Sequence, residues 1–225
     1  MQVRKRIESH FFRYLTVLMI TCLLLFPALE HFHAGLAALT LVDITAVLLA
    51  IRMAHHSRLM QVPILGLALL AVVLDLWEIS TSQREMAILS SLYFCFFYLF
   101  AIYSMLKFVL GPGQITIEKL FASIAVYMTM ALLFALIYRV IYQINPSAFN
   151  FAITPEGETS LFFEFIYFSF TTITTTGYGD VSPASHQAQA FAIVQQMIGV
   201  LYVAVLVARL TNLYSAGAPG DSDDG

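Results

Sequence analysis

Charged residues are scarce in this chain. They make up 11% of its 225 residues, whereas 60% are hydrophobic. A soluble domain has about a quarter charged residues, so the composition argues against a water-soluble fold and predicts a protein in a lipid bilayer. The net charge of −3 indicates no nucleic-acid partner. The two cysteines, Cys22 and Cys95, lie inside apolar stretches, so neither a disulfide framework nor a CxxC metal site is inferred.

Long apolar runs fill the sequence instead. A helix needs roughly 20 mainly apolar residues to cross the hydrocarbon core. Six segments meet this need, near Phe11 to Leu29, Ala34 to Ile51, Gln61 to Ile79, Met86 to Leu110, Ile117 to Ile144 and Ser185 to Tyr214. The first could instead be a cleaved signal peptide, because basic residues precede it. We therefore expect an all-α membrane protein with six transmembrane helices.

The basic residues indicate the orientation of these spans. Cytoplasmic loops collect Lys and Arg, and with the N-terminus inside, nine of the 11 basic residues are cytoplasmic: Arg4, Lys5, Arg6, Arg13, Arg52, Arg58, Lys107, Lys119 and Arg209. Arg84 and Arg139 fall on the outer side. We expect an integral protein of the plasma or bacterial inner membrane with both termini in the cytoplasm.

A further apolar block lies between the fifth and sixth spans. Residues Ser160 to Thr172 predict a helix of only about 20 Å at 1.5 Å per residue, too short for a core of about 30 Å. We expect this helix to enter from the outside, stop midway and return through Ile173 to Pro183. Irregular backbone at membrane depth is tolerated only inside protein or along a water-filled path.

The returning segment reads Thr175-Thr176-Gly177-Tyr178-Gly179-Asp180. It resembles the selectivity filter of the potassium channel family, Thr-Val-Gly-Tyr-Gly, usually followed by Asp. The resemblance covers about Ile117 to Tyr214, and the six-span layout extends it loosely to the whole chain. Two positions depart from the pattern: Thr176 replaces the usual Val, and Thr171 replaces a Glu with which some bacterial relatives brace the Asp.

The resemblance implies roles for the filter residues. The carbonyls of Thr175, Thr176, Gly177 and Tyr178 would replace the water around potassium, and Gly179 and Asp180 would lie at the outer mouth. Glycine at alternate positions suits this task, because it enters positive φ without a Cβ clash. Tyr178 is expected to pack against the pore helix, with Tyr167 as a hydrogen-bonding neighbour. Potassium is the permeant ion, and no cofactor is expected.

One filter loop cannot encircle an ion, so four copies must meet on an axis. The sequence has no internal repeat, which predicts a homotetramer embedded in membrane lipids. Three regions are expected: a four-helix transmembrane domain at 1–110, a pore domain at 111–214 and a disordered cytoplasmic tail at 215–225.

The sixth span carries the candidate gate. In related channels, a glycine about 20 residues after the last filter glycine acts as a bending point, and Gly199 has this offset from Gly179. Val203, Val207 and Thr211 follow at four-residue steps and share one helix face, where the valines would form an apolar constriction. Alternatively, Gly199 permits close helix packing and the valines are core residues.

The fourth span lacks the repeated basic residues of a voltage sensor, because it has only Arg84 and Lys107, about 35 Å apart along a helix. We expect little intrinsic voltage dependence, since steep gating needs several charges per subunit. Asp43 and Asp75 lie within the second and third spans, where an ionisable group suggests a gating role or a structural hydrogen bond.

Three other classes of protein fit the sequence less well than a potassium channel. A membrane enzyme with a histidine metal site is disfavoured because His31, His33 and His186 fall outside, whereas His10, His55 and His56 fall inside. A potassium-transporter subunit would place four degenerate filter repeats in one chain, whereas this chain has one filter with an intact Gly-Tyr-Gly. A nonselective cation channel is closer, but Tyr178 argues against it. The expected function is therefore passive potassium conduction, without enzymatic activity.

Overall fold

The computed structural model describes residues 10–30, 84–112, 116–155 and 157–217, with the side chains of residues 27–30, 86, 158–159 and 210–217 left aside. These residues form five α-helices: α2 (Phe11–Glu30), α5 (Arg84–Leu110), α6 (Ile117–Ile144), α7 (Gly157–Ile173) and α8 (His186–Gly217). A 3-10 turn (Pro146–Ala148) and two short strands, β1 (Phe149–Phe151) and β2 (Val181–Pro183), connect α6, α7 and α8.

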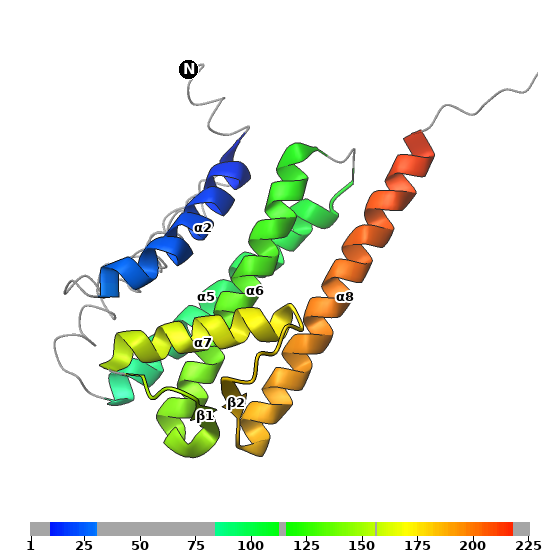
Figure 1. Cartoon of the computed structure of the whole chain (residues 1–225). Helices are drawn as coiled ribbons and strands as arrows, with labels where there is room; N and C mark the ends of the chain where they lie inside the picture. The colour runs from blue at the N-terminus through cyan, green and yellow to red at the C-terminus, as the bar shows by residue number, and fades with distance from the viewer. Residues whose placement is uncertain (1–9, 31–83, 113–115, 156, 218–225) are drawn as a thin grey trace, which may run out of the picture.

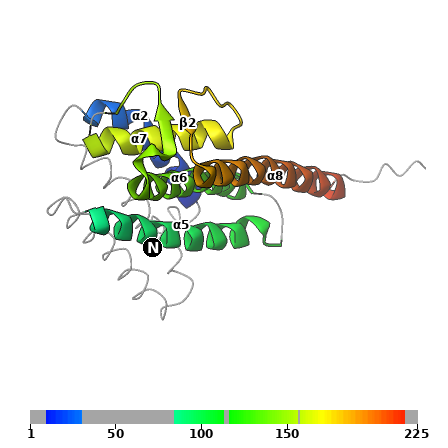
Figure 2. The same ribbon diagram turned by 90° about the horizontal axis from the view of Figure 1, so that it is seen from below.

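Helix α6 is the centre of the fold. Most of its residues from Ala122 to Tyr138 are buried, and it lies between α5 on one side and α7 on the other (Figure 2). Helix α2 also packs on α6, where the Thr16 hydroxyl donates to the Phe121 carbonyl at 3.1 Å. The choice between a span and a signal peptide for the first segment stays open.

The predicted spans are matched in part. Among the described residues, three helices are long and apolar enough to cross a membrane: Ala87–Leu110, Ile117–Ile144 and His186–Arg209. The apolar part of α2, Phe11–Phe26, is shorter. The second and third predicted spans lie outside the described residues, so a total of six spans stays a prediction. Helix α8 continues to Gly217, slightly beyond the predicted end at Tyr214.

Helix α7 has the short, crossing placement expected of a re-entrant helix. It crosses α6 and ends beside α8, and the chain then turns back to β2 (Figure 1). Strand β2 pairs antiparallel with β1, with Asn150 opposite Ser182. This two-stranded sheet joins the loop after α6 to the segment after the predicted filter, and no pattern in the sequence predicts it.

Aromatic rings hold α7 against the neighbouring elements. The Phe149 ring of β1 packs edge-on against Phe165 of α7, with ring centroids 5.1 Å apart. Tyr138 of α6 lies against Phe168 of α7 at 4.9 Å. Phe165 and Tyr138 are fully buried. Such ring pairs contribute beyond their buried area, so this end of the molecule has a densely packed core that fixes the position of α7.

Candidate functional site

The loop from Thr174 to Asp180 begins where α7 ends. The amide groups of Thr176 and Gly177 both donate to the Thr171 carbonyl, at 2.8 and 3.2 Å, and the Thr175 amide donates to the Thr172 carbonyl at 3.0 Å. These bonds satisfy carbonyls that the end of a helix leaves without partners. The first half of the predicted filter is thereby tied to the last turn of α7.

Alternate residues of this loop have positive φ angles: 59° at Thr175, 56° at Gly177 and 85° at Gly179. Where left-handed and right-handed backbone conformations alternate, successive peptide carbonyls point to the same side. In an extended strand, successive carbonyls point to opposite sides. The carbonyls of the loop can then face one side. Among the described residues, Thr175 is the only non-glycine with a positive φ. Such strain in a β-branched residue is typical of a functional site.

The carbonyl oxygens of the loop are open to a ligand. Every residue from Thr174 to Asp180 is exposed. In the described part of the chain, no donor is hydrogen-bonded to the carbonyls of Thr175, Thr176, Gly177 or Tyr178. A row of unpaired carbonyl oxygens is what a dehydrated cation requires. The four residues predicted as ion ligands therefore share exposed positions and unpaired carbonyls, and their role stays a prediction.

Asp180 is braced at the end of the loop that leads into β2. The Tyr167 hydroxyl donates to its carboxylate at 2.6 Å, and the Tyr167 ring stacks on the Tyr178 ring at 6.2 Å with an interplanar angle of 3°. Tyr167 is thus the neighbour of Tyr178, as expected, but its hydrogen bond goes to Asp180. The Thr171 hydroxyl bonds to the Phe168 carbonyl instead, so Tyr167 and not Thr171 braces Asp180.

The Tyr167–Asp180 bond shifts the pKa of both groups. It holds the pKa of Asp180 below its usual value, with the Val181 amide adding to the effect and desolvation opposing it. The same bond, with desolvation and the nearby Asp180 charge, raises the pKa of Tyr167 to about 12. The stabilisation that the Asp180 carboxylate gives to the fold is present above the pKa that Asp180 has in the unfolded chain, and it is lost as pH falls through the lowered pKa of the folded protein. The stabilisation that Tyr167 gives is present below the pKa of tyrosine in the unfolded chain, and it is lost as pH rises through about 12.

Tyr167→Phe should therefore lower thermal stability by a constant amount between about pH 5 and about pH 9, because neither partner titrates there. The measurement is the unfolding midpoint of the purified protein and the variant across this range. In more acidic buffer the difference should shrink as Asp180 is protonated. A difference that changes steeply near neutral pH would contradict this account of the pair.

The Thr176 hydroxyl has a hydrogen-bond partner, which a valine side chain at this position would not need. It lies 2.9 Å from the Thr174 hydroxyl, which itself donates to the Phe170 carbonyl at 2.7 Å. Thr176 is thus the donor in this contact. The hydroxyl is satisfied within the chain, so the departure from the common valine adds a hydrogen bond within the loop and leaves the Thr176 carbonyl unpaired.

Strand pairing anchors the far end of the loop. The Ala152 amide donates to the Asp180 carbonyl at 2.7 Å, and the Val181 amide donates to the Asp180 side chain at 3.0 Å. Val181 is buried. Both ends of the loop are therefore held by main-chain bonds, while the residues between them keep exposed carbonyls.

Gly199 lies in α8 at a point of close contact with α7. A Cβ at Gly199 would lie 2.5 Å from the Ile173 carbonyl oxygen and 2.7 Å from the Ile173 Cγ1. This contact favours the packing alternative for Gly199, and the bending role stays a prediction. Val203 and Val207 are 46% and 52% exposed on α8. Thr211 lies in α8, but its side chain is outside the described part, as are Asp43 and Asp75.

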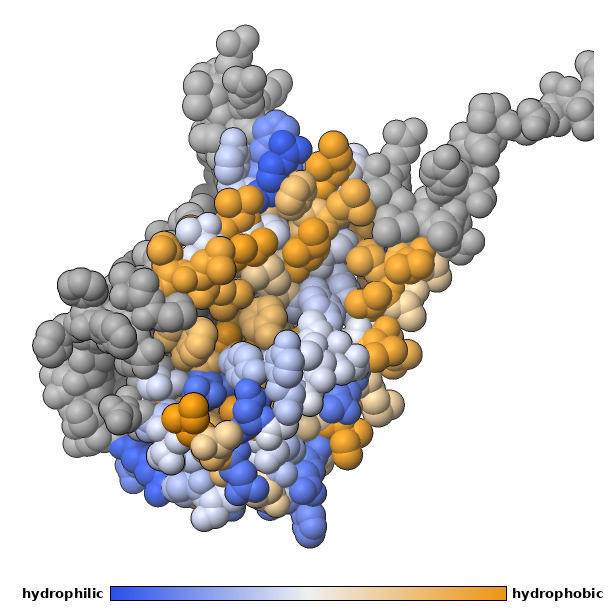
Figure 3. Space-filling model, viewed as in Figure 1, coloured by the Kyte–Doolittle hydropathy of each residue, from blue (hydrophilic) through white to orange (hydrophobic). Residues whose placement is uncertain are grey.

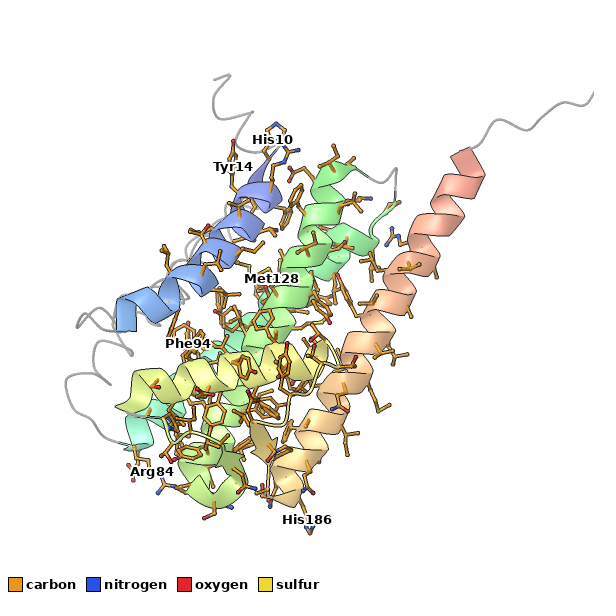
Figure 4. All side chains as sticks on the ribbon, viewed as in Figure 1. His10, Tyr14, Arg84, Phe94, Met128 and His186 are labelled. Atoms are coloured by element: carbon orange, nitrogen blue, oxygen red, sulfur yellow. The ribbon has the colours of Figure 1, made fainter. Side chains whose placement is uncertain are left out.

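Among the described residues, no group of His, Cys, Asp and Glu could hold a metal ion. His10 and His186 lie at opposite ends of the molecule (Figure 4). Arg84 lies at the same end as His186 and bonds to the Ile144 carbonyl. At the His10 end, Arg209 and Lys119 both donate to the Gly111 carbonyl, at 2.7 and 3.1 Å. Among the described basic residues, Arg84 therefore lies at one end of the molecule and Lys119 and Arg209 at the other, and the orientation in the membrane stays a prediction.

Gln195 and Gln196 are polar residues in the middle of an apolar span, so the sequence predicts that at least one of them faces protein and not lipid. The structure agrees: Gln195 of α8 is fully buried and bonds to Tyr138 and Ser169, whereas Gln196 is exposed. The Tyr127 hydroxyl also donates to the Ile173 carbonyl at 2.8 Å, which no local pattern indicates.

Comparisons with known proteins agree with this geometry. Residues 126–216 match the model of a family described as "Ion channel". Protein LctB of Bacillus caldotenax is 32% identical over 105 residues, which cover 45% of this chain and 76% of that protein. No solved structure gives a significant match. With a relative of this similarity and an ion-channel match over the loop and its flanking helices, the chain belongs to the ion channel family.

Proposed function

We propose that the chain is one subunit of a homotetrameric channel that conducts potassium selectively and passively across the cell membrane. The observation that carries the proposal is the loop from Thr175 to Gly179, with positive φ at alternate residues and unpaired carbonyls between them. Potassium gives up its water only where oxygens replace it, and a filter of main-chain carbonyls supplies them. Potassium is then the permeant ion, and neither a cofactor nor catalysis is proposed.

The tetramer follows from what one chain lacks. One loop offers carbonyls from one side only, and four copies around an axis would surround the ion. Unpaired carbonyls at membrane depth are tolerated only where they line a cavity, which a closed ring supplies. The side of α8 away from α6 is apolar and exposed (Figure 3), with Val194, Met197 and Leu201 about half exposed. This face would contact neighbouring subunits or lipid.

The rest of the proposal concerns orientation and gating. The His10 end of the molecule would face the cytoplasm, as both termini would, and the loop mouth would face outward. Helix α5 has only Arg84 and Lys107 as basic residues, so little intrinsic voltage dependence is proposed. Val203, Val207 and Thr211 are proposed to line the gate, and Gly199 of the same helix packs against Ile173. Asp43 and Asp75 are proposed as intramembrane modulators.

Reversal potentials test the proposal. The purified protein in a planar bilayer, under opposing tenfold gradients of potassium and sodium, should reverse about 59 mV from zero, at the potassium equilibrium potential. A value near zero would favour a nonselective cation channel. The same recordings test gating, because a current that rises e-fold within a few millivolts would contradict weak voltage dependence. Membranes without protein are the control.

A further inference from the structure

A buried polar relay joins three helices behind the loop. Gln195 of α8, Ser169 of α7 and Tyr138 of α6 are all fully buried. The Tyr138 hydroxyl donates to the Gln195 Oε1 at 2.6 Å. The Gln195 Nε2 donates to the Ser169 carbonyl at 3.0 Å and lies 2.6 Å from the Ser169 hydroxyl oxygen. The side-chain amide of Gln195 therefore links α6 to α7.

The direction of each bond in the relay is fixed. The Ser169 hydroxyl donates its proton to the Ala131 carbonyl of α6 at 2.6 Å, so its oxygen accepts from the Gln195 Nε2. Tyr138 has only its hydroxyl proton to give, so the Gln195 Oε1 accepts. An amide provides both a donor and an acceptor at this point. A carboxylate could not donate to Ser169, and an apolar side chain could make none of these bonds.

The relay acts on the part of α7 that carries the filter. Ser169 lies one turn before Ile173, where α7 ends. One turn along α8 from Gln195, Gly199 lies against that same Ile173, and the Tyr127 hydroxyl holds the Ile173 carbonyl from α6 at 2.8 Å. The last turn of α7 is therefore held by α8 on one side and by α6 on the other. The first amides of the filter donate hydrogen bonds to the carbonyls of this turn, at Thr171 and Thr172.

We propose that Gln195 is a positioning residue for the filter, setting the height and rotation of α7 against α8 so that the carbonyl ring keeps the spacing that discriminates potassium from sodium. Apolar packing is not directional, whereas a hydrogen-bonded amide permits one register of the two helices. This inference rests on the proposed function, because selectivity is the quantity that the position of α7 would set.

Two variants separate positioning from mere stability. Gln195→Met keeps the length of the side chain but leaves Tyr138 and Ser169 without their partner, so it should lower thermal stability as well as selectivity. The triple variant Tyr138→Phe, Ser169→Ala and Gln195→Met replaces the whole relay with apolar groups. Because no buried polar side chain is left unpaired, its stability should return towards that of the wild type.

The measured quantity is the ratio of sodium to potassium permeability, taken from reversal potentials, beside the unfolding midpoint of the assembly. We expect the ratio to rise about tenfold in both variants, which corresponds to ~1.4 kcal/mol of lost discrimination. Gln196→Met is the matched control, since it makes the same chemical change at the adjacent exposed residue, and it should keep the wild-type ratio.

Two results would overturn the inference. One is a triple variant that regains both stability and the wild-type permeability ratio, because the relay would then serve folding alone. The other is an equal shift in Gln196→Met, because the effect would not belong to the relay. Failure of the proposed function looks different: the wild-type protein itself would not discriminate between the two ions.

Discussion

Gly179→Ala should abolish potassium conduction. Gly179 has a φ of 85°, and no atom lies within 4 Å of the place where a Cβ would be, so the cost of alanine is one of backbone conformation and not of space. That cost is roughly 1–2 kcal/mol for an L-residue. Four subunits would sum it to ~4–8 kcal/mol, enough to lower flux by at least about 10³-fold if the strain is relieved by turning the Tyr178 carbonyl away from the ion.

Gly157→Ala is the matched control. Gly157 has a φ of 86°, and a Cβ there also meets no atom within 4 Å, but it lies at the start of α7 and contributes no carbonyl to the filter. Both variants carry the same backbone strain, so their loss of thermal stability should be similar. Only Gly179→Ala should lose potassium flux into liposomes. Equal loss of flux in both would show that strain anywhere in the pore region suffices, and would contradict the role assigned to the loop.

Local patterns in the sequence were enough to predict the helices around the loop. The predicted fifth span and helix α6 share the bounds Ile117 and Ile144, because a continuous apolar run ends there at Asn145 and Pro146. The short helix before the filter was predicted at Ser160 to Thr172 and extends over Gly157–Ile173. The length of the apolar run distinguishes the two helices, since the fifth span is long enough to cross a bilayer and the helix before the filter is not.

Contacts between distant segments were not predictable in the same way. The positive φ of Thr175 has no signal in its residue type, because threonine usually avoids this conformation. Its strain is maintained by bonds to the end of α7. The pairing of β1 with β2 joins residues about 30 positions apart, and neither three-residue strand has a recognisable pattern by itself. The choice of Asp180 as the partner of Tyr167 likewise depends on how α7 and the loop fold together.

Gly199→Ala should destabilise the assembly, although alanine is the better helix former. In a helix interior, alanine gains about 1 kcal/mol over glycine. Against this gain, the new Cβ would lie 2.5 Å from the Ile173 carbonyl oxygen, a main-chain atom that cannot rotate away. Overpacking of this kind costs about 1–3 kcal/mol, so we expect a lower unfolding midpoint and reduced flux. If Gly199 serves only as a hinge, alanine should raise the midpoint and impair opening alone.

A displaced glycine separates the two roles of Gly199. Val200 follows Gly199 in α8 and is 55% exposed, so Val200→Gly supplies backbone freedom one residue away without relieving the contact with Ile173. Adding Val200→Gly to Gly199→Ala should restore flux if bending is the only requirement. We expect no rescue, because the room beside Ile173 is still filled. Val200→Gly alone is the control for the helix propensity that the second glycine costs. Recovery of both midpoint and flux in the double variant would contradict close packing as the reason for glycine at this position.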